Sequence, residues 1–337
     1  MIRIQNIYYM LSYAFTVLKE QGYKELGSED FENTAELLSE ILIKGINSQI
    51  KRGLGKTYNE QTETLSGLRG KIDLQDSIKR QTVIKQQLVC TYDEFTTNTY
   101  SNQIIKSTII FLLKSDISKT RKKKFKNLLM YFADADMLDI HSINWKIKYN
   151  RNNQTYRMLI NICYLIIEGL LQKQSEGNYK LMDYIDEQNM NRLYEKFILE
   201  YYRKEHPELH ANPAHVDWAL DNDYDFMLPT MRTDVTLTKD NKTLIIDAKY
   251  YDSSTQNYYN TPKNRSGNIY QIFTYVKNKA EEGGEVSGML LYAKTDDEVQ
   301  PDNEYMMSGN KISVKNLDLD LPFAEIKNQL DNIVAYI

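Results

Sequence analysis

The sequence has little cysteine, glycine or proline. Its 337 residues include two cysteines, 14 glycines and six prolines. Cys90 and Cys163 lie far apart and form no C-x-x-C pair, which excludes a disulfide framework and a cysteine-rich zinc site and favours a reducing compartment. With 42% hydrophobic and 26% charged residues, the chain is not of a disordered or low-complexity class. Its length predicts about two domains of ~150 residues each.

Long hydrophobic runs are also absent. The most apolar run, residues 158–171, is interrupted by Asn161 and Glu168. It is shorter than the ~20 residues needed to span a bilayer, so we expect a buried helix. The N-terminal segment lacks the unbroken apolar core and small-residue cleavage site of a signal peptide. These features predict a cytoplasmic protein.

No large excess of positive charge is present. The 42 basic and 46 acidic residues give a net charge of −4, which argues against coating nucleic acid by bulk charge. The charge is uneven, because residues 114–157 contain 11 basic and four acidic side chains. This segment could contact phosphates. A solvated helix face around residues 122–126 is the commoner explanation of such a charge run, and both interpretations stay open.

The two halves of the chain differ in pattern. Apolar residues at helical spacing predict a largely helical first half, with helices near 7–18, 38–46, 105–113 and 158–171 and short strands between 68 and 91. From about Gly177 helices and strands alternate as α-β-β-β-α-β, which predicts a small α/β domain with helices flanking one sheet. Its expected elements are a helix at 188–204, strands at 215–220, 231–238 and 243–250, a polar loop at 252–267, a helix at 268–280 and a strand at 286–293. A strand near 311–314 and a helix near 323–336 follow.

Two familiar motifs fail. The segment Gly53-Leu-Gly-Lys-Thr57 resembles the end of a P-loop, but Ile50 stands where that motif requires glycine, and the segment follows a helix rather than a strand. Two histidines lie four residues apart at His206 and His210, but Pro207 breaks a helix there. We expect neither a nucleotide site nor a zinc site at these positions.

One pair of strands carries a pattern of charges with chemical meaning. Asp247 and Lys249 lie in a β-type run and project from one face, because side chains alternate along a strand. The turn-forming pair Asp240-Asn241 joins this run to the preceding strand. A hairpin symmetric about that turn puts Asp234 directly opposite Asp247, with Cβ atoms ~4.5 to 5.5 Å apart.

Two carboxylates so close repel each other unless a proton or cation lies between them. All-oxygen ligands favour Mg²⁺ or Mn²⁺ over zinc. Lys249 could hold a water molecule and stabilise charge that builds on a phosphate. We therefore interpret Asp234, Asp247 and Lys249 as a phosphodiester hydrolysis site. The alternative, an internal salt bridge, leaves the second carboxylate uncompensated.

This arrangement resembles the PD-(D/E)xK nuclease superfamily, although Thr233 replaces the proline of that pattern. The resemblance implies that the metal is held by Asp234, Asp247 and the backbone carbonyl of Ala248. It also implies a glutamate from the preceding helix, which matches Glu195, although a solvated glutamate fits as well. A Q-x-x-x-Y motif of some branches matches Gln271 and Tyr275, which we expect to project away from the apolar stripe of their helix, as cleft residues or as ordinary surface residues.

A resemblance to the McrC family, the nuclease subunits of McrBC restriction systems, covers nearly the whole chain. It is carried by five segments: 6–14 (NIYYMLSYA), 51–54 (KRGL), 102–108 (NQIIKST), 231–234 (MRTD) and 246–251 (IDAKYY). The resemblance implies a partner, an McrB-like AAA+ ring that binds GTP and recognises methylated DNA. This chain would bind the ring, stimulate GTP hydrolysis and cut DNA.

We therefore expect a partner-binding region at 1–176 and a Mg²⁺-dependent nuclease domain at 177–337. The basic stretch 119–126 would meet either the ring or DNA. We expect the loop 252–267 to be mobile until DNA binds, with Lys263 and Arg265 contacting phosphates, although a solvated connector is an equal alternative. Other functions open to the sequence are a non-catalytic activator of an AAA+ ring and a stand-alone defence or repair nuclease.

Overall fold

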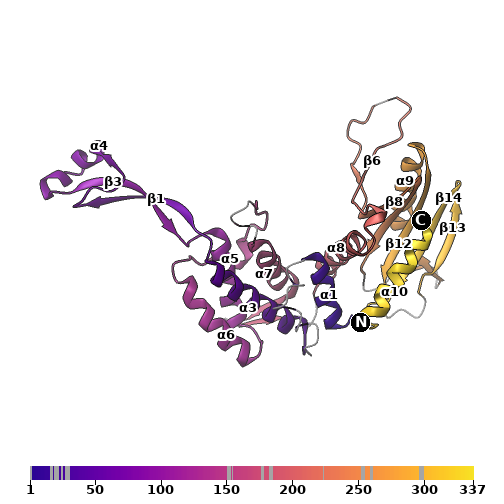
Figure 1. The fold of residues 1–337 in the computed structure, drawn as a ribbon, viewed down its shortest axis with the longest axis horizontal. Coiled ribbons are helices and arrows are strands. Elements are labelled where there is room, and N and C mark those ends of the chain that lie inside the picture. The colour runs from indigo at the N-terminus through magenta and orange to yellow at the C-terminus, as the bar shows by residue number, and fades with distance from the viewer. Residues whose placement is uncertain are drawn as a thin grey trace. The chain divides into compact units, whose positions relative to one another are not determined.

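The chain forms two compact units, and the second is inserted into the first. The computed structural model describes residues 2–15, 18, 23, 26, 31–149, 153, 155–175, 178–181, 185–222, 224–251, 255–258, 261–295 and 300–337. Unit 1 comprises Met1–Leu37 and Asp183–Ile337, and unit 2 comprises Leu38–Met182. The structural boundary thus lies at 182/183 rather than 176/177, and the first 37 residues belong with the C-terminal part (Figure 1). The expected division of labour between 1–176 and 177–337 stays a prediction.

Unit 1 is built around one mixed sheet. Its helices are α1 (Ile4–Ala14), α8 (Glu187–Glu205), α9 (Ser266–Glu281) and α10 (Phe323–Ile333), with short 3-10 turns at Pro207–Leu209 and Val334–Tyr336. Its main strands are β8 (Val235–Lys239), β9 (Lys242–Lys249), β12 (Glu285–Ala293), β13 (Asn303–Met307) and β14 (Asn310–Leu317). They follow the order β13-β14-β12-β9-β8, with β9, β12 and β14 parallel to one another.

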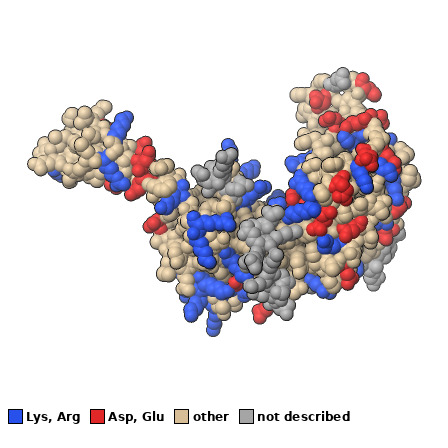
Figure 2. All heavy atoms as spheres, in the orientation of Figure 1, with Lys and Arg blue, Asp and Glu red and all other residues tan. Residues whose placement is uncertain are grey.

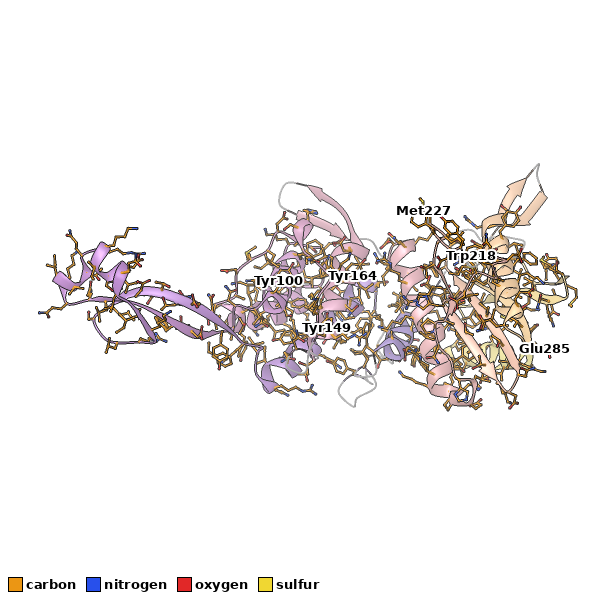
Figure 3. The ribbon with its side chains drawn as sticks, turned by 90° about the horizontal axis from the view of Figure 1, so that it is seen from above. Tyr100, Tyr149, Tyr164, Trp218, Met227 and Glu285 are labelled. Atoms are coloured by element: carbon orange, nitrogen blue, oxygen red, sulfur yellow. The ribbon has the colours of Figure 1, made fainter. Side chains whose placement is uncertain are left out.

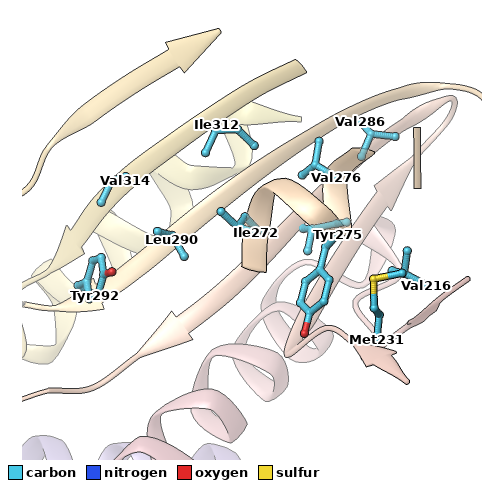
Figure 4. Packing of buried hydrophobic residues seen from close by; sticks show 11 residues of the cluster. Val216, Met231, Ile272, Tyr275, Val276, Val286, Leu290, Tyr292, Ile312 and Val314 are labelled. Atoms are coloured by element: carbon cyan, nitrogen blue, oxygen red, sulfur yellow. The ribbon is translucent and has the colours of Figure 1, made fainter. Parts of the chain in front are cut away.

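Helix α9 packs closely on one face of this sheet. Ile272 and Val276 of α9 join Ile245, Leu290 and Val314 of the strands in one buried cluster (Figure 4). A Cβ atom at Gly288 of β12 would lie 2.7 and 2.8 Å from the side chains of Val276 and Ile272. Glycine at this position therefore lets the helix approach the sheet.

The N-terminal helix α1 is part of unit 1, where it packs against α8. The buried Asn6 amide donates to the carbonyl oxygens of Leu319 and Leu321 at 2.7 and 2.9 Å. The ring of Tyr9 stacks on Phe323 with centroids 4.4 Å apart. The segment 6–14, one of the five that carry the resemblance to the McrC family, thus joins the chain before unit 2 to the chain after it.

Unit 2 is mostly helical and carries an extended β arm. Its elements are α3 (Thr34–Arg52), which begins in unit 1, β1 (Thr57–Leu65), β2 (Lys71–Asp73), α4 (Leu74–Lys79), β3 (Leu88–Thr96), α5 (Tyr100–Leu113), α6 (Lys119–Leu129), α7 (Tyr156–Leu170), β4 (Leu171–Ser175) and β5 (Asn178–Leu181), with 3-10 turns at Thr82–Lys85, Met130–Phe132 and Ile140–Ser142. Strands β1 and β3 pair along nine residues each, and α4 lies at the far end of this arm (Figure 1). No described helix is long and apolar enough to cross a bilayer.

Several predicted elements are confirmed and others are wrong. The helix at 158–171 and the strands at 243–250 and 286–293 lie within about two residues of α7, β9 and β12. The expected strand 215–220 shrinks to β6 (His215–Val216), which pairs only with β7 (Met231–Arg232) and lies outside the main sheet. The alternation of apolar residues over 215–220 instead serves to pack Val216 and Trp218 against the core. The expected change of pattern near Gly177 lies outside the described residues.

Candidate active site

The predicted hairpin register is confirmed. Val235 pairs with Ile246 and Lys239 with Lys242, so the two-residue turn is Asp240-Asn241. Asp240 has a φ of 52°, as tight hairpin turns require. One step beyond the last pair, β8 ends and Asp234 lies between β7 and β8, where its Oδ2 accepts a hydrogen bond from the Ala248 N–H at 3.0 Å. The break in the expected strand 231–238 therefore places Asp234 beside Asp247.

Lys249 lies between the two carboxylates. Its Nζ is 2.9 Å from Asp247 Oδ2 and 3.8 Å from Asp234 Oδ2. The side chain of Asp247 is 1% exposed, that of Lys249 12% and that of Asp234 20%. Three charges are thus removed from water at the end of β9, where burial is costly unless they compensate one another.

Burial dominates the electrostatics of this cluster. Desolvation raises the pKa of the Asp247 carboxyl to about 7, and the negative charge of Asp234 adds to the effect, while Lys249 opposes it. Desolvation also raises the pKa of Asp234, again against Lys249. Burial alone would lower the pKa of Lys249, but the two aspartates outweigh it and raise that pKa above its usual value. Lys249 is therefore a fixed cation and not a proton donor near neutral pH.

Helix α8 brings Glu195 to the same cluster. The pKa of Glu195 is raised to about 7, first by burial and then by the charge of Asp234, and Lys249 lowers it in part. The Asn191 amide, one turn earlier on α8, donates a hydrogen bond to Glu195 Oε1. The expectation of a glutamate near the aspartates thus agrees with its position, and its role stays a prediction.

The structure adds Tyr292, which the sequence analysis missed. Tyr292 lies in β12 in register with Lys249, is fully buried, and its hydroxyl accepts a hydrogen bond from the Asn268 amide at 2.8 Å. Its pKa is raised, mainly by burial, with smaller effects from Tyr251 and Asp247. The sequence gives a weak indication, since Tyr292 follows the apolar run Met289–Leu291 in the strand beside β9.

The donor set of the cluster suits a divalent cation. Asp247 Oδ1 has no hydrogen-bond partner among the residues that the structure describes, although it is buried. Both aspartates present hard oxygen ligands, as Mg²⁺ and Mn²⁺ require. Within the described residues, no group of three or more His, Cys, Asp or Glu side chains is assembled for a metal ion. A cation held here would therefore depend on two carboxylates and on backbone oxygen, for which Ala248 stays the candidate.

Gln271 and Tyr275 do not both project away from the core. Tyr275 is 9% exposed and packs with Val216 and Met231, so that expectation is wrong for Tyr275 (Figure 4). Gln271 is half-buried and donates a hydrogen bond to the Tyr275 hydroxyl at 2.9 Å. The core stripe of α9 is wider than expected because β6 and β7 cover this side of the helix. A catalytic role for either residue stays a prediction.

The expected loop at 252–267 contains a β-hairpin. Strands β10 (Thr255–Tyr258) and β11 (Thr261–Asn264) pair antiparallel, and α9 already begins at Ser266. The prediction of a long loop is therefore wrong over these residues, because the backbone groups of one strand find their hydrogen-bond partners in the other. Lys263 lies in β11, and the guanidinium of Arg265 lies 4.2 Å from the centre of the Tyr251 ring. Phosphate contacts by both residues stay a prediction.

The basic stretch 119–126 forms most of α6. Arg121 and Lys124 both pair with the buried Glu40, at 3.2 and 2.8 Å. Lys119, Lys123 and Lys126 are exposed, and basic side chains gather over α6 in Figure 2. Part of this charge therefore stabilises unit 2, and the remainder is available to an acidic partner or to phosphates.

A hollow is lined by residues of β6, β7 and the chain between them. Its volume is about 470 Å³, and His215, Asp217, Trp218 and Leu228 are among its lining residues. The indole N–H of Trp218 donates to the Pro229 carbonyl at 2.8 Å. Met227, at the outer edge of unit 1 in Figure 3, is 86% exposed. The lining of this hollow includes none of the residues of the aspartate–lysine cluster.

Comparison with known proteins identifies the family. A family model described as McrBC 5-methylcytosine restriction system component matches residues 4–293. The chain is 30% identical over 339 aligned positions to the Type IV methyl-directed restriction enzyme EcoKMcrBC of Escherichia coli (strain K12), covering 98% of this chain and 97% of that protein. It also resembles a chain in a half-complex from the tetradecameric assembly of Thermococcus gammatolerans McrB AAA+ hexamers with bound McrC, with a TM-score of 0.54 and 16% identity over 96% of this chain and 76% of that one. The chain therefore belongs to the family of McrBC 5-methylcytosine restriction system components.

Proposed function

We propose that this protein is the Mg²⁺-dependent DNA endonuclease subunit of a modification-dependent restriction complex. The observation that carries the proposal is the buried cluster of Asp234, Asp247 and Lys249 at the end of β9. Carboxylates in this arrangement lower the stability of the fold unless a cation compensates them. A catalytic role for these residues would explain why the fold keeps charges that lower its stability. The resemblance to the PD-(D/E)xK pattern indicates that this role is phosphodiester hydrolysis.

Each residue of the cluster has a separate role in the proposed phosphodiester hydrolysis. Asp234, Asp247 and the Ala248 carbonyl would hold Mg²⁺ or Mn²⁺, which when bound supplies a Lewis acid at the phosphoryl group. Lys249 stays protonated, so its ammonium group can orient a water molecule and stabilise negative charge that develops on the phosphate. Glu195, with a pKa near neutrality, is suited to accept a proton from that water.

We further propose that an McrB-like AAA+ partner binds GTP and recognises 5-methylcytosine, and that this chain stimulates its GTP hydrolysis. The failed P-loop agrees with GTP binding by the partner, since Gly55 is engaged inside unit 2 by the hydroxyl of Tyr156 at 2.7 Å. The expected docking region, 1–176, includes helix α1, but α1 belongs to unit 1. We therefore assign the docking surface to unit 2, which contains most of that region. There, the end of the β arm exposes Leu74, Ile78 and Ile84 at 62%, 69% and 79%, and the face of this end seen in Figure 2 shows mostly side chains other than Lys, Arg, Asp and Glu.

Cleavage of methylated plasmid DNA tests the nuclease proposal. The chain is incubated with its ring partner, GTP and Mg²⁺, and Asp234→Asn and Asp247→Asn are compared with the wild type. We expect both variants to lose cleavage and to retain stimulation of GTP hydrolysis. The matched control is Asp221→Asn, an exposed aspartate of unit 1 that should leave both activities unchanged.

Two outcomes would favour the other functions. Full cleavage by both aspartate variants would remove the assignment to this cluster, and absence of cleavage by the wild type with intact GTPase stimulation would indicate a non-catalytic activator. Cleavage that needs neither partner nor GTP would indicate a stand-alone nuclease.

A further inference from the structure

Asn191 makes two hydrogen bonds that join helix α8 to strand β9. Its Oδ1 accepts a hydrogen bond from the Tyr250 N–H at 2.7 Å, and its Nδ2 donates to Glu195 Oε1. Tyr250 follows directly after Lys249, where the ladder with β12 ends. The side-chain amide therefore satisfies a backbone donor just beyond the strand that carries two residues of the cluster.

The second bond of Asn191 fixes a carboxylate. Asn191 and Glu195 are one helical turn apart on α8, so their side chains are neighbours on the same face. Glu195 is half-buried and interacts electrostatically with both Asp234 and Lys249. An unrestrained glutamate side chain has three rotatable bonds and would point its charge toward water, away from two aspartates. The hydrogen bond that the Asn191 amide donates to Glu195 Oε1 opposes that movement.

We propose that Asn191 is a positioning residue that holds Glu195 at the cation site and keeps it in register with Asp247 and Lys249. This inference rests on the proposed function, because it assigns Glu195 to the same site. Asn191 itself touches neither the cation nor the substrate. Its amide is suited to the task because it can accept from the strand and donate to the helix at once, which a carboxylate or an apolar side chain cannot do.

Calorimetric titration of the full chain with Mn²⁺, without DNA or partner, tests the inference. We expect Asn191→Ala to weaken Mn²⁺ binding about 10-fold, the lower end of what loss of a supporting residue at a metal site causes, because Glu195 would no longer hold its negative charge beside the two aspartate ligands. In a Glu195→Gln background the same substitution should have no further effect, because Asn191 acts through the glutamate. Additive losses in the double variant would show a merely structural role and overturn the inference.

A second variant separates the two hydrogen bonds. Asn191→Asp still accepts from the Tyr250 N–H but repels Glu195 instead of donating to it, so we expect slower plasmid cleavage than in the wild type at saturating Mn²⁺. A wild-type rate in Asn191→Asp, or wild-type Mn²⁺ affinity in Asn191→Ala, would overturn the inference. Gln188→Ala, an exposed position in the first turn of α8, is the control.

These outcomes are distinct from a failure of the proposed function. If Asp247→Asn binds Mn²⁺ as tightly as the wild type, the cation site itself is misassigned and the proposed function fails. If Asp247→Asn loses binding while the Asn191 variants do not, only the inference about Asn191 fails.

Discussion

Lys249 occupies a position between two carboxylates, so the folded protein without a cation is held by an ion pair at its candidate site. The Asp247–Lys249 distance of 2.9 Å alone is that of an ordinary salt bridge. The pKa of Asp247 is nevertheless raised, although a nearby cation by itself would lower the pKa of an aspartate. At this residue, burial outweighs the ion pair.

This leads to a prediction for Asp247→Asn in metal-free buffer. The folded state keeps a proton on Asp247 that the unfolded chain releases at lower pH, so this group makes the protein less stable as pH rises from about 4 to about 7. The substitution should therefore raise the free energy of unfolding by roughly 1 to 3 kcal/mol at pH 8, and the gain should vanish near pH 4. Chemical denaturation in EDTA across this range measures the difference; destabilisation at every pH would show that Asp247 serves a structural salt bridge.

Lys249→Met separates the cation of the side chain from its packing. The change preserves an apolar stem of similar length and should reduce cleavage by ~10² to 10³, because a charge near the developing negative charge is lost. Affinity for Mn²⁺ should not fall, since the nearest competing cation has been removed. Much weaker Mn²⁺ binding in calorimetry would indicate that Lys249 holds the two aspartates in place.

The sequence predicts the positions of those cluster residues that lie on two strands joined by one turn. The alternation of side chains and a two-residue turn fix the register that brings Asp234 to Asp247. Tyr292 and Asn191 could not be identified, because they come from elements distant in sequence, and their contacts depend on tertiary packing. Tyr275 was misplaced for the same reason, since β6 and β7 cover a helix face that looks exposed in isolation.

At the scale of elements, the β arm of unit 2 exposes apolar side chains to water, and in that position they do not stabilise the isolated protein. We expect the double substitution Ile78→Ser and Ile84→Ser to reduce stimulation of the partner's GTP hydrolysis at least ~10-fold, because full burial of an isoleucine side chain contributes about 1.5 to 3 kcal/mol. The melting temperature should be unchanged, since both side chains are already exposed. GTPase assays with Lys79→Ala as the control measure this, and normal stimulation would exclude the arm from docking.

Helix α1 leads to a different expectation. Asn6→Ala removes the side-chain donor of the Leu319 and Leu321 carbonyl groups just before α10 and leaves Leu319 with the long bond from the Arg3 N–H, 3.5 Å, which should cost about 1 to 3 kcal/mol. Hydrogen exchange should then increase in α8 and α10 but not in α5 and α7 of unit 2. Gln5→Ala, a less buried position on the same helix, should have little effect. Equal increases in both units would contradict the assignment of α1 to unit 1.

The elements that the sequence predicts well are those whose pattern is self-contained. Helix α7 and strands β9 and β12 are long and strongly apolar, so the spacing of their apolar residues clearly indicates a helix or a strand. The polar residues of β10 and β11 predict a loop instead of a hairpin, and no apolar pattern indicates β13, since three of its five residues are exposed. The packing of α1 on α8 joins residues separated by all of unit 2, and no local pattern indicates it.

On the scale of the whole molecule, the candidate cation site lies entirely within unit 1. Addition of Mn²⁺ should therefore stabilise one unit selectively, since a ligand stabilises only the structure that binds it. We expect hydrogen exchange to slow in residues 183–337 and in α1, with no change in residues 38–182. Slowing of equal size in both units would show that they unfold as one cooperative structure, and loss of the effect in Asp247→Asn confirms that it arises at the site.

The insertion of unit 2 into unit 1 also sets an order of events on the ribosome. Helix α1 is synthesised first, but its partners α8 and α10 emerge only after the whole of unit 2. All of unit 2 is therefore synthesised before α1 can contact its partners. The sheet that carries Asp247 is completed only when β12 and β14 have been made. A nascent chain of this protein thus completes its proposed docking unit well before its candidate cation site, so the proposed nuclease activity would be the last property that synthesis gives it.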